Sequence, residues 1–159
     1  LLAEAQGMVI HATGIKENGE GILFAGVSGS GKSTLASFYQ GQKKAMILSD
    51  DRVIIRKQQG KFWIFGTPWH GEVKLYSAQK AVLKKIIFLR HGAENRMKKA
   101  ERVEASSRLV VCSFPPFWSK KKMESTLRLV DSLTEEIPCY DLAFVPDRSV
   151  LSVIRKLQA

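Results

Sequence analysis

The chain has 159 residues, of which 45% are hydrophobic and 25% are charged, and its 25 Lys and Arg against 15 Asp and Glu give a net charge of +10. This is the composition of a globular protein with a core, so intrinsic disorder and collagen-like or mucin-like classes are excluded. The longest apolar stretches fall far short of the roughly 20 residues that cross a bilayer, and no secretory signal is visible, so we expect no membrane partner.

No internal repeat, low-complexity tract or Pro/Gly/Ser-rich linker divides the sequence, so we expect residues 1–159 to form a single domain. The two cysteines, Cys112 and Cys139, belong to no CxxC or Cys/His cluster. This pattern argues against a zinc site or a disulfide framework and favours a reducing, cytoplasmic environment. The positive charge is regional, because residues 84–128 hold 12 Lys or Arg against 4 Asp or Glu. Such a segment is either a solvated helical face or an attraction for an anionic partner.

Strand patterns dominate the first half of the chain, where apolar and β-branched residues are frequent. In chain order, we predict strands at Met8–Lys16 and Gly21–Ala25, a helix at Lys32–Gln40 that Gly41 ends, and strands at Ala45–Leu48, Arg52–Lys57, Lys61–Phe65 and Lys84–Leu89. The Asn-Gly pair between the first two strands and the Gln-Gln-Gly sequence before Lys61 favour two tight hairpins.

Helical spacing dominates the second half. We predict helices at Asn95–Val111 and Ser119–Ile137, a strand at Cys139–Val145 and a closing helix that Asp147 caps. The second of these helices carries a stripe that we expect to pack in the core: Met123, Leu127, Val130, Leu133 and Ile137. Two prolines exclude regular helix at Phe114–Trp118, which leaves an ordered turn or an exposed apolar loop. The whole order predicts an α/β fold with a β-rich first half and a mixed α and β second half.

A glycine-rich loop follows the second predicted strand and opens the first predicted helix. Its sequence matches the complete P-loop (Walker A) pattern, with Thr34 after it: Gly26-Val27-Ser28-Gly29-Ser30-Gly31-Lys32-Ser33. The glycines let backbone N–H groups converge on phosphate oxygens, Lys32 reaches the terminal phosphates, and the Ser33 hydroxyl would hold Mg²⁺. We therefore expect nucleotide or pyrophosphate binding by residues 26–34; the alternative is a glycine-rich turn that only links strand to helix.

Two carboxylates, Asp50 and Asp51, come directly after the next predicted strand, 18 and 19 residues after Lys32. In an α/β sheet the carboxyl end of a strand beside the P-loop faces the bound phosphates, so this pair would supply a catalytic base and a metal ligand. Adjacent residues on an extended segment point in opposite directions, so the two would divide these roles. The alternative is a pair of aspartates that caps a loop.

His11 lies on the strand before the P-loop strand, and the predicted hairpin brings it next to the phosphate site. A lone histidine on a strand is otherwise a core residue. The reaction class depends on these neighbours, because ATPases, kinases and GTPases share the P-loop. Neither an LSGGQ-like nor an NKxD-like sequence is present, so an ABC-type ATPase and a GTPase are not favoured.

Three segments in this order resemble the catalytic domain of HPr kinase/phosphorylase: His11-Ala12-Thr13, the P-loop, and Ser49-Asp50-Asp51-Arg52-Val53. The ATP-dependent phosphoenolpyruvate carboxykinases share a similar order. The resemblance covers residues 8–57 and implies a P-loop kinase fold, ATP or pyrophosphate as donor, Mg²⁺, and transfer to a serine. It also implies that Asp50 takes the proton of the acceptor hydroxyl, that His11 lies close enough to tune Asp50, and that Asp51 and Ser33 serve the metal. Which aspartate is base and which is ligand stays open.

The later glycine-rich signature of that family is not found, and Gly66–Glu72 follows the second hairpin instead. This segment is either a substrate loop, with His70 or Glu72 near the phosphates, or a plain turn with a packed Trp69. In size the chain resembles single-domain relatives of this kinase from modified-peptide pathways, including kinases of lasso-peptide precursors.

The basic segment at residues 84–128 suits an acceptor that is an acidic peptide or protein. We expect no nucleic acid partner, since no RNP-like, helix-turn-helix or zinc-finger motif is present. A homo-oligomer is compatible with the sequence. A nucleotide-binding regulatory module without transfer, and a small-molecule kinase, are the alternatives.

Overall fold

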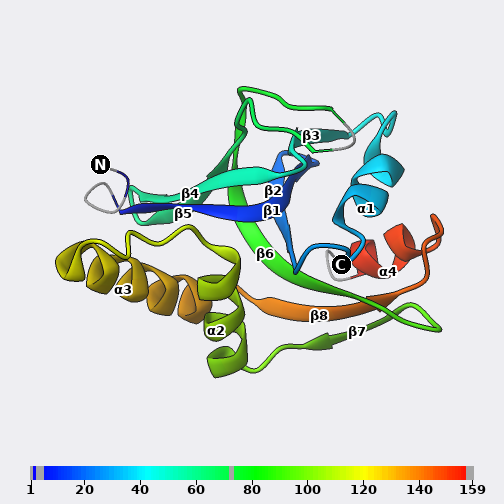
Figure 1. The fold of residues 1–159 in the computed structure, drawn as a ribbon. Helices are drawn as coiled ribbons and strands as arrows, with labels where there is room; N and C mark the ends of the chain where they lie inside the picture. The colour runs from blue at the N-terminus through cyan, green and yellow to red at the C-terminus, as the bar shows by residue number, and fades with distance from the viewer. Residues whose placement is uncertain (1, 3–5, 72–73, 157–159) are drawn as a thin grey trace.

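The computed structural model of the chain describes residue 2 and residues 6–71 and 74–156, which form eight strands of one sheet and four helices (Figure 1). In chain order the elements are β1 (Gly7–Glu17), β2 (Glu20–Ala25), α1 (Lys32–Tyr39), β3 (Ala45–Ser49), β4 (Arg52–Gln58), β5 (Lys61–Phe65), β6 (Lys80–His91), β7 (Arg96–Lys99), α2 (Arg102–Cys112), α3 (Lys120–Glu136), β8 (Cys139–Phe144) and α4 (Val150–Lys156). The predicted α/β class, with a β-rich first half, is confirmed. No helix in these ranges is long and apolar enough to span a bilayer.

Five strands pair in a closed ring, in the order β2, β1, β4, β5, β6 and back to β2. β6 closes the ring because its 12 residues pair with β5 at the start of the strand and in parallel with β2 along its middle. The end of β6 continues beyond the ring and pairs with β8, which pairs with β7. The carboxyl ends of β2 and β6 therefore meet at the same edge of the sheet.

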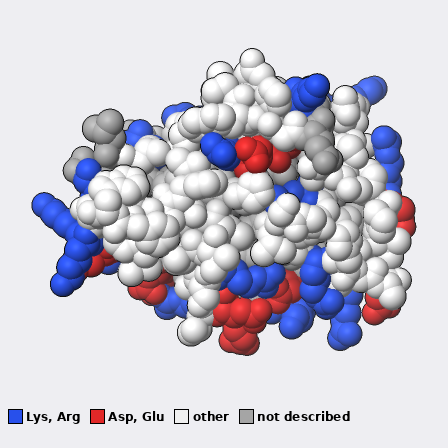
Figure 2. All heavy atoms as spheres, viewed as in Figure 1, with Lys and Arg blue, Asp and Glu red and all other residues white. Residues whose placement is uncertain are grey.

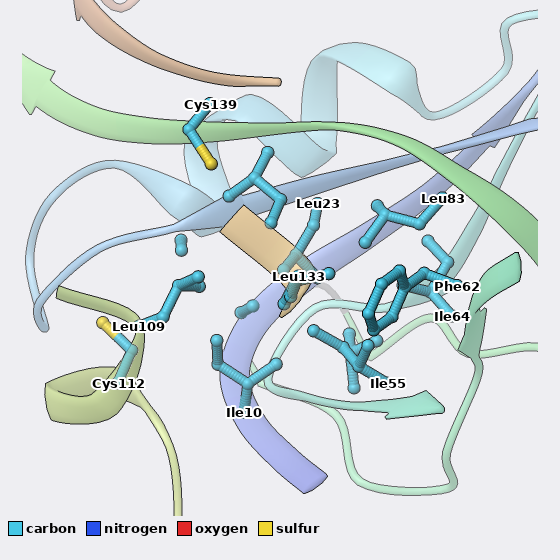
Figure 3. Packing of buried hydrophobic residues seen from close by; sticks show 14 of the residues in the cluster. Ile10, Leu23, Ile55, Phe62, Ile64, Leu83, Leu109, Cys112, Leu133 and Cys139 are labelled. Atoms are coloured by element: carbon cyan, nitrogen blue, oxygen red, sulfur yellow. The ribbon is translucent and has the colours of Figure 1, made fainter. Parts of the chain in front are cut away.

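Two hydrophobic clusters hold the helices on the sheet. The first fills the inside of the ring and extends to α2 and α3; Figure 3 shows Ile10, Leu23, Ile55 and Phe62 packed toward Leu109 and Leu133. The second lies between β2, β6, β8 and the other two helices, α1 and α4 (Figure 1). Alternate residues of a strand point to opposite faces. β4 therefore buries Val53 and Ile55, and β5 buries Phe62 and Ile64, while β2 is buried on both faces because the second cluster covers its other side.

Both predicted hairpins are confirmed, and their turns have the backbone that the sequences favour. Asn18 and Gly19 have φ of 51° and 86°, and Gln59 and Gly60 have φ of 51° and 71°. Two successive positive φ values are the pattern of a type I′ turn, whose twist matches that of paired strands.

The prediction of a helix from Asn95 is wrong in its first part, because Arg96–Lys99 forms β7 and α2 begins only at Arg102. The short, polar strand exists through its antiparallel pairing with β8, a partner more than forty residues along the chain. The predicted stripe on α3 is also wrong at Leu127, which is 44% exposed. The buried face of α3 is instead formed by Thr126, Leu129, Val130 and Leu133.

Candidate functional site

The loop between β2 and α1 has the backbone of a phosphate-binding cradle. Gly29 and Gly31 have φ of 79° and 94°, a region that side chains other than hydrogen rarely allow. A Cβ atom at Gly31 would lie 2.5 Å from Cζ of the buried Phe144 ring, so this position accepts glycine for two reasons. The first helical hydrogen bond of α1 runs from Leu35 N to Gly31 O at 2.9 Å. The backbone N–H groups of the first turn that precede Leu35 have no carbonyl partner within the helix. Such groups at a helix N-terminus point outward and can bind an anion.

Lys32 lies along this loop rather than out in solvent. Its side chain is buried, and Nζ donates to Gly26 O at 2.7 Å and to Val27 O at 3.0 Å. Burial lowers the pKa of Lys32, and the nearby Cys112 and Asp51 act against this shift. The loop carbonyls thus hold the ammonium group in the cradle, where it can meet phosphate oxygens.

A cavity of about 270 Å³ joins the three predicted motifs. It is lined by His11, Ser28, Gly29, Gly31, Lys32, Ser33, Thr34, Asp50, Asp51, Gly71 and His91. The predicted residues Gly26, Val27 and Ser30 belong to the same loop but do not line this cavity. Figure 2 shows a small acidic area near the centre of the viewed face, with basic atoms close to it and uncharged atoms around it.

Asp50 is buried at the cavity. The residue is 3% exposed, and the Gly71 N–H donates to its Oδ1 at 2.7 Å. The segment before Gly71 is tied to the same place, because the Ser49 hydroxyl donates to Trp69 O at 2.7 Å and the Thr67 hydroxyl to Arg52 O at 2.5 Å. The Gly66–Gly71 segment therefore lies over the aspartate pair.

The other residues expected from this segment behave differently. His70 stacks on Tyr76, with 6.1 Å between ring centroids, and does not line the cavity. Trp69 is 47% exposed and so is not packed in a core. Glu72, the other residue that a substrate loop would bring near the phosphates, lies outside the described residues.

His11 pairs with Asp51, whereas the sequence analysis expects it beside Asp50. Its Nδ1 lies 3.2 Å from Asp51 Oδ1, and Arg52 Nε lies 3.4 Å from Asp51 Oδ2. The strand register is the reason: His11 is opposite Arg52, and the Ala12 N–H donates to Asp51 O at 3.0 Å. Burial, and then the charge of Lys32, lower the pKa of His11, while Asp51 raises it. The net lowering keeps the imidazole mostly neutral at pH 7.

His91 also lines the cavity, although no sequence motif points to it. Its Nε2 lies 2.7 Å from Gly29 O, and its ring stacks on Phe144 with 6.1 Å between centroids. Because a carbonyl oxygen only accepts, Nε2 carries the proton. His91 ends β6, the parallel neighbour of the P-loop strand. The carboxyl end of a strand beside the P-loop strand faces the bound phosphates, so the same rule that predicts Asp50 and Asp51 at the site could have predicted His91.

The aspartate pair reaches the cavity by a different route from the expected one. β3, which precedes Asp50, pairs antiparallel with β1 and not with β2, so β1 separates it from the P-loop strand. β3 and β4 both pair with β1, and the aspartates form the link between them. The aspartates lie beside the middle of β1. The same part of β1 pairs with the end of β2, where Ala12 is opposite Ala25, so the aspartates come close to the start of the P-loop.

Two residues at this cavity have oxygen donors of the kind that magnesium prefers. Ser33 and Asp51 both line it. No group of three or more His, Cys, Asp and Glu side chains suited to a metal occurs among the described residues. Mg²⁺ in phosphoryl-transfer sites is held by one or two protein oxygens together with substrate phosphates, so two ligands suffice.

Acidic neighbours neutralise part of the basic segment at residues 84–128. Arg108 pairs with Asp141, and Arg102 Nη2 lies 2.7 Å from Asp131 Oδ1. Lys98 Nζ also lies 3.8 Å from Asp141 Oδ2. These ion pairs neutralise several of the basic side chains, so the segment attracts anions less strongly than its count of Lys and Arg suggests.

Comparison with known proteins gives a family for the chain. A family model described as "SynChlorMet cassette protein ScmC" matches residues 1–145. The chain belongs to this ScmC family. A search of curated proteins found no match. Among solved structures, the chain is similar to the Hpr(Ser) kinase/phosphatase from Coxiella burnetii, with 12% identity, a TM-score of 0.47, and coverage of 94% of this chain and 92% of that one. A likeness at this level says nothing about the reaction.

Proposed function

We propose that this ScmC-family protein is a P-loop kinase that binds ATP, or pyrophosphate, with Mg²⁺ and transfers the terminal phosphoryl group to a serine hydroxyl on a peptide or protein. The observation that carries the proposal is the buried carboxylate of Asp50, which lines the same cavity as Lys32 and Ser33. A site that only binds nucleotide can use one carboxylate to hold the magnesium ion, and Asp51 can serve that purpose, so such a site has no evident need of Asp50 as a second carboxylate. A kinase needs one to accept the hydroxyl proton.

The proposal gives roles to several of the residues that line the cavity. Lys32 and the first-turn N–H groups of α1 bind the phosphates, and Ser33 and Asp51 would hold a magnesium ion, which would supply charge neutralisation on the phosphates. Asp50 takes the proton as the serine oxygen bonds to phosphorus and the bond to the leaving phosphate breaks. The Gly71 N–H keeps the Asp50 carboxylate in place, and His11 positions Asp51 through the pair at 3.2 Å.

The size of the cavity supports a large acceptor. At about 270 Å³ it lies below the roughly 300–1,000 Å³ of pockets that enclose whole small molecules. It can hold phosphates and the reacting hydroxyl, while the rest of both substrates extends over the surface. The family description as a cassette protein is compatible with an acceptor encoded by the same cassette.

The test is to incubate the protein with γ-labelled ATP and Mg²⁺ and a panel of acceptors: acidic serine peptides, HPr, sugars and nucleosides. We expect label on serine in one or more of the acidic peptides. Labelled small molecules with unlabelled polypeptides would overturn the peptide acceptor. ATP binding with no transfer to any acceptor would instead favour the regulatory module.

A further inference from the structure

Among the residues that the structure describes, no helix packs on the outer face of β1, β4 and β5, and this face begins at the site. β1, β4 and β5 turn one set of side chains into the ring core and the alternate set outward. The outward set is half-buried, and neither hydrophobic cluster that anchors the helices includes it. We call this set the outer strip: Val9, Arg52, Ile54, Arg56, Trp63 and Phe65.

The strand register arranges the outer strip in rows that lead away from Asp51. Arg52 lies opposite His11 in the first row. Ile54 lies between Val9 and Phe65 in the second row, and Arg56 lies opposite Trp63 in the third. Arg56 lies four residues further along the extended strand than Arg52, which is about 13 Å. The strip is therefore as long as four residues of an extended peptide.

Basic groups and aromatic rings alternate around the apolar middle row. Arg52 Cζ lies 5.6 Å from the ring centroid of Trp69 and 5.1 Å from that of Phe114, which is 52% exposed. Lys80 Nζ lies 4.5 Å from the ring centroid of Trp63 and 5.7 Å from that of Phe65. Cations thus lie at both ends of an apolar floor.

We propose that the outer strip binds the acceptor as an extended segment, with an apolar side chain on the middle row and a carboxylate at Arg56, about four residues from the target serine. This inference rests on the proposed function, because it takes the serine to be at Asp50. Complementary charge orients a bound chain and rejects partners of the wrong sign. A single nucleic acid strand is less suited, since base stacking needs open ring faces and each of these rings already has a cation over it.

The probes are short fluorescein-labelled peptides with serine at the centre, leucine two residues away and either Asp or Lys four residues away, on each side in turn. Binding to the full chain is measured by anisotropy, and phosphoryl transfer is measured separately. We expect the Asp peptide of one orientation to bind about fivefold more tightly than its Lys counterpart, the upper range for an exposed ion pair. Arg56→Glu should reverse this preference and Arg56→Gln should abolish it.

Lys43→Glu is the matched control, because Lys43 is an exposed lysine in the turn between α1 and β3, away from the outer strip. It should leave the preference unchanged. Equal binding of Asp and Lys peptides, or an equal effect of Lys43→Glu, would overturn the docking surface. Tighter binding of a random single-stranded oligonucleotide that Arg56→Glu weakens would replace the peptide with nucleic acid. If phosphoryl transfer occurs at the same rate with Asp and Lys peptides, the kinase proposal stands and the outer strip is not the docking surface. If the Asp peptide binds selectively but no transfer occurs, the outer strip is a docking surface and the kinase proposal is wrong.

Discussion

The imidazole of His11 and the carboxylate of Asp51 form a pair, with 3.2 Å between Nδ1 and Oδ1. The pair joins β1 to the aspartates that follow β3, so two motifs from distant parts of the chain are in contact. It also separates the aspartates chemically, since Asp51 faces a histidine and an arginine while Asp50 accepts the Gly71 N–H.

The first prediction concerns the pH dependence that His11 gives to folding. Its pKa in the folded protein is below the ordinary 6.5, so the folded state binds this proton only at lower pH than the unfolded state does. The stability linked to His11 is present above pH 6.5 and is lost as the pH falls through the lowered value. Denaturant unfolding of the parent and of His11→Asn between pH 7.5 and about pH 5 measures this difference. A gap between the two proteins that stays constant with pH would contradict the prediction.

The second prediction is that Lys32 is needed for phosphate binding. ATP or pyrophosphate with Mg²⁺ should raise the melting temperature of the parent, because a ligand that binds only the folded state stabilises it. Lys32→Ala should largely abolish this rise, whereas Lys44→Ala, at an exposed lysine after α1, should keep it. An unchanged rise in Lys32→Ala would show that the loop is not the phosphate site.

The third prediction uses His91, whose hydrogen bond to Gly29 O fixes the loop from β6. His91→Phe keeps a ring against Phe144 but removes the donor, and a neutral hydrogen bond contributes about 1 kcal/mol. We expect nucleotide affinity to fall about fivefold in a calorimetric titration. His70→Phe is the control, because His70 contacts Tyr76 and not the loop. Equal affinities for the parent and His91→Phe would remove His91 from the site.

The fourth prediction contrasts two glycines of one loop. Both have positive φ, so alanine at either is strained by about 1 kcal/mol. At Gly29 no atom lies within 4 Å of an added Cβ, whereas at Gly31 the Phe144 ring lies 2.5 Å away. Gly31→Ala should therefore lower the free energy of unfolding by about 3 kcal/mol and Gly29→Ala by about 1 kcal/mol. Equal losses would mean that Phe144 moves aside freely.

Local sequence rules predict the parts of the fold that depend on neighbours in the chain. The turn at Asn18-Gly19 and the P-loop at the start of α1 need only the residue types at those positions. β7 is missed because Arg96–Lys99 has the composition of a helix surface and becomes a strand only through its pairing with β8. Leu127 is misassigned because several helix faces fit the spacing, and packing against the sheet and α2 selects the one with Leu129.

The site, like the fold, has features that local sequence predicts and features that depend on contacts between distant segments. Motif spacing predicts that His11, Lys32, Ser33 and the aspartates lie close together, and all of them line one cavity. The pairing of His11 with Asp51 depends on the register of β1 against β4, which spacing does not reveal. His91 is missed because its place beside Gly29 depends on β6, not β3, being the neighbour of β2.

The fifth prediction assigns the base. Asp50→Asn keeps the size of the side chain and the contact with Gly71 but removes the group that accepts the proton. Nucleotide binding should remain, and transfer should fall by about 10²-fold or more, the usual loss for a general base. Transfer at the parental rate would show that Asp50 is not the base.

Single-turnover transfer tests the central claim most directly. The protein, in excess over γ-labelled ATP with Mg²⁺, is mixed with the acidic serine peptide that binds best, and the label is followed over time in ATP, peptide and inorganic phosphate. The account predicts that label leaving ATP appears on the peptide serine with the parent and stays in ATP with Asp50→Asn. Label that passes only to inorganic phosphate, or at the same rate in both proteins, would contradict it.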